Sequence, residues 1–432
     1  MQERLIIRNA RVVDPSCGDD DVRDVGVADG LIVPPSQAGG GACLDARGLA
    51  LTPGLIDLHV HLRDPGQIDK EDIASGTRAA AAGGFTAVLA MPNTRPPMDN
   101  ADALRATLAR AQEFAAVRVL QAGALSIGLA GRELADFAAL RAAGAAALTD
   151  DGRCVQSNAL MLEALRRARA LGLAVLDHCE DEGLAARGCV HPGELARSLG
   201  ALPMAAAAEE AVVARDAVLA REAGWPVHIQ HVSSGLSVDL VRWARSRGLP
   251  LTAEAAPHHI CLTAEACLEH GTNAKMNPPL RGADDRRAIL DGLQDGTITV
   301  IASDHAPHTA AEKDVAFQEA PSGIVGVEVA LALCLGELYH SGRLPLLDFV
   351  GKFTTGPARV LGLPMGTLAA GAPADLTFID VDREWVIDVR QFLSRSRNCP
   401  YHGRRCRGRA VATLVGGRWA WRDPEFDSRL RG

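Results

Sequence analysis

The sequence predicts an α/β fold: a (β/α)8 barrel of the TIM type, with a small β domain formed by both ends of the chain. Two observations lead to this prediction. The middle of the chain alternates short apolar runs with helical stretches rich in Ala, Leu and Arg, which is typical of parallel strands connected by helices. The two ends contain only strand-like segments, which lack a core of their own.

The terminal segments alternate apolar and polar residues, as short antiparallel strands do, and two of them contain glycine turns at Asp29-Gly30 and Gly416-Gly417. In chain order they are Arg4–Val13, Val25–Val33, Leu44–Leu51, Ala374–Asp380 and Ala410–Trp421. We therefore assign residues 1–52 and 365–432 to one small β-sandwich domain, and residues 53–364 to the barrel.

Eight apolar runs are the predicted barrel strands: Leu55–Leu62, Phe85–Met91, Val117–Leu125, Ala145–Thr149, Ala174–His178, Val227–Val232, Leu251–Ala256 and Ile298–Ser303. Helical patterns lie between and after them: Glu71–Ala82, Ala101–Ala115, Asn158–Leu171, Ala205–Ala223, Leu236–Arg247, Asp284–Leu293 and a closing helix near Val327–Tyr339. A doubly wound open sheet would alternate in the same way. The absence of a Gly-x-Gly-x-x-Gly motif after the first strand favours the barrel.

Composition limits the class of partner. A net charge of −8 over 432 residues argues against nucleic acid or an anionic membrane, since either would attract a basic surface. The N-terminus is charged within its first residues, and no apolar run approaches the roughly 18 residues of a membrane helix. We expect a cytoplasmic protein that acts on a small polar molecule.

The stretch Pro53–Gly66 begins as a buried strand and ends with two histidines, an arginine and a Pro-Gly turn. Side chains two positions apart on a strand point to the same side, so His59 and His61 can bind one metal ion. A lone His-x-His more often marks an ordinary strand end. Further ligand-type residues strengthen the metal hypothesis, because they recur where other strands end.

In a barrel the C-terminal ends of all eight strands meet on one rim. The residues predicted for this rim are His59, His61, Arg63, Asn93, Asp150, Asp151, His178, His231, His258, His259, Asp304, His305 and His308. Their histidines and aspartates exceed what one tetrahedral ion needs and suit two divalent ions, with zinc favoured by the mixture of imidazole and carboxylate. Arg63 can bind a substrate carboxylate with its planar guanidinium, Asn93 and Asn277 can hydrogen-bond to substrate, and His308 can donate to a substrate anion.

Four stretches resemble the signature motifs of the dihydroorotases, a family of the amidohydrolase superfamily: Asp57–Gly66, Met91–Thr94, Lys275–Arg281 and Ser303–His308. The resemblance spans nearly the whole chain. Hydantoinases and allantoinases share the His-x-His pair and the later ligands, whereas Arg63 and the Asp-His-Ala-Pro-His stretch are dihydroorotase-like.

The resemblance implies two zinc sites, with one zinc ion as the alternative: His59, His61 and Asp304 hold the first ion, and His178 and His231 hold the second. Many members of the superfamily bridge the ions with a carboxylated lysine after the fourth strand. This chain has Thr149-Asp150-Asp151-Gly152 there, as in bacterial dihydroorotases that use an aspartate. We predict that Asp151 is the bridge, with Asp150 as the alternative.

Substrate contacts implied in the same way are Arg63, Asn93, Asn277, His308 and the backbone around Ser322 and Gly323. Ser322 stands where the family often has an aromatic residue. The polar segment from Thr309 to Pro321 is predicted to be a mobile loop that closes over the substrate.

The implied reaction is the reversible cyclisation of N-carbamoyl-L-aspartate to L-dihydroorotate plus water, a step of pyrimidine (UMP) biosynthesis, with Asp304 as the catalytic base. One alternative is a hydantoinase-like cyclic amidase. Another is a non-catalytic dihydroorotase-like subunit that scaffolds aspartate transcarbamoylase, although such subunits lose metal ligands. The resemblance leaves open a homodimer and an active complex with that transferase.

Overall fold

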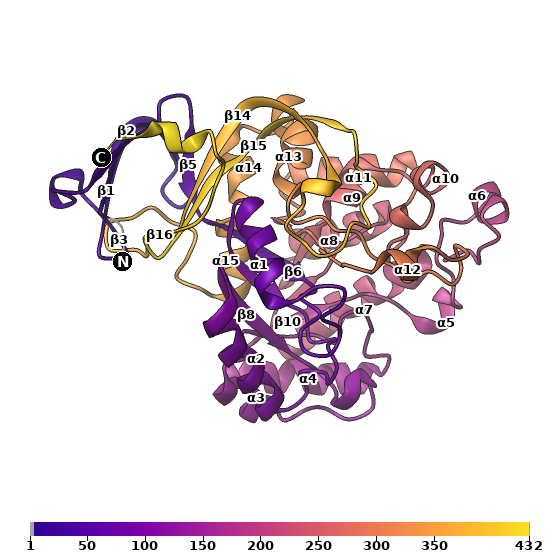
Figure 1. Ribbon diagram of the computed structural model, residues 1–432. Helices are drawn as coiled ribbons and strands as arrows, with labels where there is room; N and C mark the ends of the chain where they lie inside the picture. The colour runs from indigo at the N-terminus through magenta and orange to yellow at the C-terminus, as the bar shows by residue number, and fades with distance from the viewer. Residues whose placement is uncertain (1–3, 432) are drawn as a thin grey trace.

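The computed structural model describes residues 4–431, and its centre is a barrel of eight parallel strands (Figure 1). Neighbouring strands follow one another in chain order: β6 (Leu55–Val60), β7 (Phe85–Ala90), β8 (Arg118–Gly123), β9 (Ala147–Leu148), β10 (Ala174–Asp177), β11 (Val227–Ile229), β12 (Leu251–Ala255) and β13 (Val300–Ile301). Val60 pairs in parallel with His305, and His61 N donates to His305 O at 2.8 Å, which brings the last strand next to the first. The predicted fold class is confirmed.

A helix follows each strand, as a right-handed barrel requires. The principal helices are α1 (Ile73–Ala82), α2 (Ala101–Phe114), α3 (Phe137–Ala143), α4 (Asn158–Leu171), α7 (Ala207–Ala223), α8 (Gly235–Ser246), α11 (Ala283–Gln294) and α13 (Ala330–Cys334). The predicted closing helix near Val327–Tyr339 is α13 continued by a π-helical turn, Leu335–His340. Side chains of Asp72, Asn100 and Ser157 cap the N-termini of α1, α2 and α4.

The eighth strand is shorter than predicted. The run Ile298–Ser303 was expected to be strand throughout, but only Val300–Ile301 is. Ile301 N donates to Lys352 O, a residue between α14 (Leu346–Gly351) and α15 (Thr355–Leu361), instead of to β6. Where the barrel closes between β13 and β6, the backbone that connects α14 to α15 therefore accepts a hydrogen bond from β13.

Both ends of the chain build one mixed sheet beside the barrel, at the left of Figure 1, where the two termini lie close together. Its strands are β1 (Leu5–Asp14), β2 (Asp19–Ala28), β3 (Leu31–Val33), β4 (Ala42–Asp45), β5 (Ala50–Pro53), β14 (Leu376–Val386), β15 (Arg405–Val415), β16 (Arg418–Arg422) and β17 (Leu430–Arg431). The N- and C-terminal parts join where β14 pairs antiparallel with β5, and the sheet has its own apolar core around Leu51, Phe378 and Leu414.

One terminal prediction is wrong. The run Leu44–Leu51 was expected to be a single antiparallel strand, but it belongs to two strands, β4 and β5, which both pair parallel to β1. Gly48, at φ +80°, lies in a turn between them, and Leu49 N donates to Ala46 O. A residue with positive φ cannot continue an extended strand, so the apolar run is divided.

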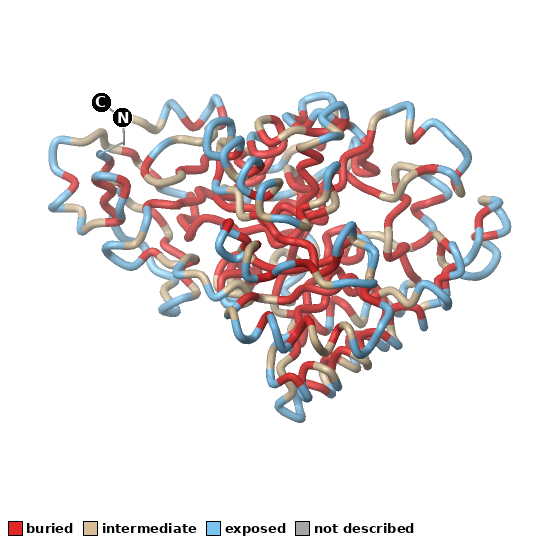
Figure 2. The backbone as a smooth tube through the Cα atoms, turned by 90° about the horizontal axis from the view of Figure 1, so that it is seen from below, coloured by how far each residue is buried: buried red, intermediate tan, exposed pale blue. Residues whose placement is uncertain are grey.

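Buried residues concentrate where the strands of the barrel meet its helices, and exposed residues lie on the loops and outer helix faces (Figure 2). Two smaller apolar clusters, one around Leu58 of β6 and one around Leu89 of β7, are separate from this main core. None of the helices in residues 4–431 is both long and apolar enough to cross a membrane.

Candidate metal centre and active site

The predicted metal ligands lie at the C-terminal ends of five barrel strands. His59 lies within β6 and His61 directly follows it, while Asp151, His178, His231 and Asp304 follow β9, β10, β11 and β13. All six side chains are buried. Because the strands are parallel and adjacent, residues far apart in the sequence reach the same rim.

Asp151 contacts all four of these histidines. Its Oδ1 lies 3.3 Å from His59 Nε2, and its Oδ2 lies 3.5 Å from His61 Nε2. The same Oδ1 lies 3.5 Å from His178 Nδ1 and 3.5 Å from His231 Nε2. Asp151 is thus shared by two groups of metal-ligand type, one with His59 and His61 and the other with His178 and His231.

Asp304 completes the first group. Its Oδ1 lies 3.5 Å from His59 Nε2 and 3.4 Å from His61 Nε2. Donors at the usual bond length of a tetrahedral zinc ion lie about 3.3 Å from one another. His59 Nε2 is buried without a hydrogen-bond partner in residues 4–431. These separations and this unpaired nitrogen fit a cation between the side chains, and the site is one for a divalent metal.

Asp150, the alternative to Asp151, points elsewhere. Its carboxylate accepts hydrogen bonds from the Ser126 amide, at 2.9 Å, and from the Ser126 hydroxyl, so it braces the loop after β8. Asp151 N donates to Thr149 Oγ1 at 3.1 Å, which helps turn its side chain toward the histidines. The geometry therefore favours Asp151 as the shared ligand.

Three residues that the sequence analysis did not assign to these roles orient the histidines from behind. Glu254 Oε1 lies 2.9 Å from His59 Nδ1, and Asn93 Oδ1 lies 3.0 Å from His61 Nδ1. Glu180 Oε2 lies 3.2 Å from His178 Nε2. Such hydrogen bonds fix the tautomer that presents the other ring nitrogen to a metal. The one signal for Glu254 was a carboxylate inside an apolar strand.

The backbone is strained at three site residues. Arg63, His231 and Asp304 have φ values of +58°, +30° and +46°. Non-glycine residues seldom adopt this left-handed region, and they cluster at functional sites when they do. The turn at each position aims the side chain into the barrel mouth instead of along the strand.

Charge and burial set the protonation of the site. Burial raises the pKa of a carboxyl group, but the charge of His59 and the hydrogen bond with His61 hold the pKa of Asp304 well below its usual value. Burial and the charge of Arg63 lower the pKa of His308 to about 2. Burial lowers the pKa of Arg63 only to about 10, so its guanidinium remains charged at neutral pH.

These groups open into one cavity of about 250 Å³. Its lining includes every predicted substrate contact, Arg63, Asn93, Asn277, His308, Ser322 and Gly323, together with His61, Asp151, Gly152, His178, His231, Met276, Asp304 and Ala306. Arg63 Nη2 lies 3.2 Å from His308 Nε2, which in turn lies 2.9 Å from Ser322 O. A cationic side chain and two carboxylates therefore face the same small space.

Asn277 and Gly323 have particular positions in this cavity. Asn277 donates to Glu180 Oε2 at 2.8 Å, while its own Oδ1 is buried with no partner among the described residues. A Cβ at Gly323 would lie 2.4 Å from Ala306 O and 2.7 Å from His308 Cδ2. Only glycine leaves room for the His308 ring at this point of the chain.

The segment predicted to be a mobile loop, Thr309–Pro321, begins with the short helix α12 (Ala310–Lys313). Lys313 Nζ donates to Thr272 O at 2.9 Å and to Pro321 O at 2.8 Å. Lys275 Nζ donates to Gln318 O at 2.9 Å. Two lysines thus tie the segment to the barrel rim in this conformation.

The remaining predicted rim residues are His258, His259 and His305, and two of them contact the loops around the site. His259 Nε2 lies 3.1 Å from Pro278 O, and His305 Nε2 lies 3.3 Å from Glu71 Oε2. His258 Nε2 lies 3.9 Å from Asp304 Oδ2 and has no hydrogen bond among the described residues. His258 is close to the centre, and the other two brace its loops.

Comparison with known proteins agrees with this geometry. Residues 48–237 match a family model described as dihydro-orotase-like. A dihydroorotase of Anaeromyxobacter dehalogenans is 48% identical over 97% of this chain and 98% of its own length. A dihydroorotase of Aquifex aeolicus is 41% identical over 97% of this chain and 100% of its own length.

Among solved structures, the L-hydantoinase of Arthrobacter aurescens superposes with a TM-score of 0.87 at 25% identity, covering 98% of this chain and 97% of its own. The barrel and its rim of histidines and aspartates define a metal-dependent cyclic amide hydrolase of the amidohydrolase superfamily. Within that superfamily, the full-length identities show that the chain belongs to the dihydroorotase family.

Proposed function

We propose that this enzyme interconverts N-carbamoyl-L-aspartate and L-dihydroorotate, with loss or gain of water, through a pair of zinc ions. The observation that carries the proposal is the single cavity in which Arg63 faces the two carboxylates, Asp151 and Asp304. The product carries one carboxylate outside its ring, and the reacting carbonyl lies within the ring. The cavity offers a partner for each.

His59, His61 and Asp304 would hold one zinc ion, and His178 and His231 the other, with Asp151 shared between them. Bound there, zinc would polarise the reacting carboxyl group and lower the pKa of water. Imidazole and carboxylate ligands favour zinc among the common divalent metals.

Asp304 would act as the base. In cyclisation it removes the proton from the ureido nitrogen as that nitrogen attacks the side-chain carboxyl carbon. A C–N bond forms and a C–O bond breaks, and the departing oxygen leaves as water after it takes the proton from Asp304 and one more from solvent. In hydrolysis Asp304 returns the proton to the departing ring nitrogen. Its low pKa keeps the carboxylate ionised at neutral pH, which is the form that a base requires.

Arg63 would bind the carboxylate outside the ring and keep the ring from turning over. Asn277 Oδ1, which has no hydrogen-bond partner within residues 4–431, can accept a hydrogen bond from a ring N–H. His308, Ser322 and Gly323 form the wall beside Arg63. The neutral imidazole of His308 adds no charge that would compete with Arg63.

A hydantoinase activity is the second candidate, supported by the similarity to the L-hydantoinase fold. Hydantoin and dihydrouracil lack the carboxylate for which Arg63 is suited. A buried guanidinium without its anion is costly, so these substrates should be poor.

Steady-state kinetics of the zinc-loaded enzyme on L-dihydroorotate, N-carbamoyl-L-aspartate, hydantoin and dihydrouracil test the proposal. We expect kcat/KM to be roughly 100-fold or more higher for L-dihydroorotate than for dihydrouracil. Arg63→Met should reduce that preference by raising KM for L-dihydroorotate. Equal rates on both substrates would contradict the proposal, and metal analysis of the same sample counts the zinc ions.

A cytoplasmic location, a homodimer and a complex with aspartate transcarbamoylase stay predictions. Light scattering of the purified chain, with and without that transferase, tests the latter two.

A further inference from the structure

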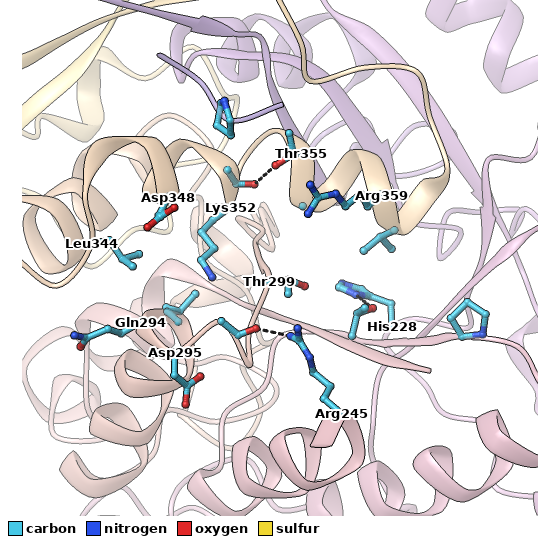
Figure 3. A pocket seen from close by; sticks show the side chains of 18 of the residues that line it. His228, Arg245, Gln294, Asp295, Thr299, Leu344, Asp348, Lys352, Thr355 and Arg359 are labelled. Atoms are coloured by element: carbon cyan, nitrogen blue, oxygen red, sulfur yellow. Dashed lines mark hydrogen bonds between the residues drawn. The ribbon is translucent and has the colours of Figure 1, made fainter. Parts of the chain in front are cut away.

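A second and larger cavity, of about 660 Å³, lies at the opposite end of the barrel. Figure 3 shows the side chains that line it. It is lined by the first residues of β10 and β12, by the end of α11, and by α14 and α15. The catalytic rim lies at the other ends of the same strands. The two cavities share no lining residue.

Three cationic side chains face this second cavity: Arg245, Lys352 and Arg359. Figure 3 shows the Lys352 ammonium group pointing into the space, with the guanidinium groups of Arg245 and Arg359 approaching from other sides. Lys352 Nζ donates to Ile298 O at 2.7 Å, and Arg245 donates to Thr297 O at 2.8 Å. Arg359 makes no side-chain hydrogen bond within residues 4–431.

None of these three cations forms an ion pair with a carboxylate of the described chain. Asp295, which also lines the cavity, is bound by Arg242 Nε at 2.9 Å. Asp348 lines it as well and is exposed on α14. The cations therefore outnumber the acidic groups, and none of the three is neutralised by contact.

Lys352 shows the electrostatic consequence. It is only 8% exposed, and burial together with the charge of Arg245 lowers its pKa to about 8. The lysine is still mostly protonated at neutral pH. Asp348 and Asp295 act on this ammonium group only from beyond ion-pair distance, so an anion bound next to it would stabilise it. Thr299 Oγ1 is also buried in the lining and has no hydrogen bond to any described residue.

Part of the wall is apolar and consists of Val175, Leu293, Leu344, Leu347 and Val360. Such a surface suits the organic part of a ligand, and the cavity is much larger than an inorganic ion requires. Two guanidinium forks and one ammonium around one space match a phosphoryl group, whose oxygens carry up to two charges, better than a single carboxylate. We propose that this cavity is a second binding site of the enzyme, for a small organic phosphate.

The site is connected to the metal centre. His228, also in the lining, lies with Nδ1 2.8 Å from Thr252 Oγ1 and with Nε2 3.0 Å from Glu254 Oε2. The other oxygen of Glu254 holds His59. A ligand in the cavity would therefore contact His228. This histidine holds Glu254, which in turn orients the predicted metal ligand His59.

Isothermal titration of the zinc-loaded enzyme with D-ribose 5-phosphate tests the proposal. We expect one site per chain with a dissociation constant of about 1 mM or lower, retained when N-carbamoyl-L-aspartate saturates the active site. Lys352→Met and Arg359→Met should each weaken binding about tenfold or more, since each removes a charge-assisted hydrogen bond. Arg359 is exposed, so Arg359→Met tests the site even if Lys352→Met unfolds.

Arg105→Met, on the outer face of α2, is the matched control and should bind normally. Inorganic phosphate should bind more weakly than the sugar phosphate, and succinate more weakly still. No binding, competition by N-carbamoyl-L-aspartate, equal affinity for succinate, or unchanged affinity in Arg359→Met would overturn the proposal.

Discussion

At the scale of single residues, Asp304 is held in the ionised form that a base requires. It lies beside His59 and His61, at φ +46°, with a pKa well below its usual value. We predict that Asp304→Asn lowers kcat about 100-fold or more, because an amide cannot take the proton. The zinc content of the variant should fall by a smaller factor than kcat. Turnover near that of the unmodified enzyme, measured with metal content in the same sample, would remove Asp304 as the base.

Asp151 and Asp150 provide a matched pair. Asp151→Ala should lose bound metal together with activity, because its two oxygens face all four histidines. Asp150→Asn should keep the metal, since Asp150 contacts Ser126 instead. Metal analysis after dialysis separates the two residues. Loss of metal only in the Asp150 variant would place the bridge there.

At the scale of elements, the segment between β14 and β15 reaches from the terminal sheet to the catalytic mouth. Asn398 Oδ1 accepts from His308 N at 3.0 Å, and Asn398 Nδ2 donates to Ala306 O at 3.1 Å and to Gly323 O at 2.9 Å. One buried amide therefore fixes two walls of the substrate cavity.

We predict that Asn398→Ala raises KM and lowers kcat/KM about tenfold, at unchanged metal content, because three hydrogen bonds that position His308 and Gly323 are lost. Ser396→Ala is the control, because Ser396 lies in the same segment but does not line the cavity. Its Oγ donates to Lys70 O at 2.7 Å. If both variants behave alike, the effect belongs to the segment and not to Asn398.

The same segment introduces a dependence of stability on pH. Glu328 accepts from the amides of Leu393, at 3.0 Å, and Ser394, at 3.1 Å, and burial raises its pKa from 4.5 to about 7. The folded protein therefore binds a proton that the unfolded chain releases, and stability falls as the pH rises from 4.5 to 7.

We predict that this loss amounts to about 2–3 kcal/mol and that Glu328→Gln removes it, because glutamine does not ionise. Denaturant unfolding of both proteins across this pH range measures the difference. Parallel stability curves would show that Glu328 titrates normally.

At the scale of the whole molecule, the terminal sheet docks on the barrel through specific polar contacts. Thr377 Oγ1 donates to Gly84 O at 2.6 Å, and Thr413 Oγ1 donates to Ala81 O at 2.7 Å. Asp375 accepts from Arg118 Nε at 2.8 Å and Nη2 at 3.0 Å. We propose that residues 1–52 with 365–432 and residues 53–364 are two units that fold together.

Asp375→Asn should lower the melting temperature by about 2–4 °C, for a loss of about 1 kcal/mol, with kcat unchanged. Asp375 also accepts from Gly416 N, at 2.7 Å, so its loss loosens a turn of the sheet as well. Asp382→Asn, which breaks an exposed pair with Arg407, should change little. Two separate thermal transitions would contradict folding as one unit.

Periodicity in the sequence was enough to predict the barrel, its helices, the joining of the two ends and the residue types of the rim, because these depend on local backbone preference and on the direction of parallel strands. Boundaries were less certain where long-range pairing decides them, as at the short strand β13 and at the division of Leu44–Leu51 by Gly48.

The orientation of Asp151 rather than Asp150 toward the histidines, the support of His59 by Glu254, and the reach of Asn398 to His308 depended on the tertiary structure. These features are contacts between segments far apart in the chain, or choices of side-chain direction. Neither kind of feature produces a periodic pattern of residues in the sequence. The cavity around Lys352 also depended on the tertiary structure, because it forms where the N-terminal ends of β10 and β12 meet α14 and α15.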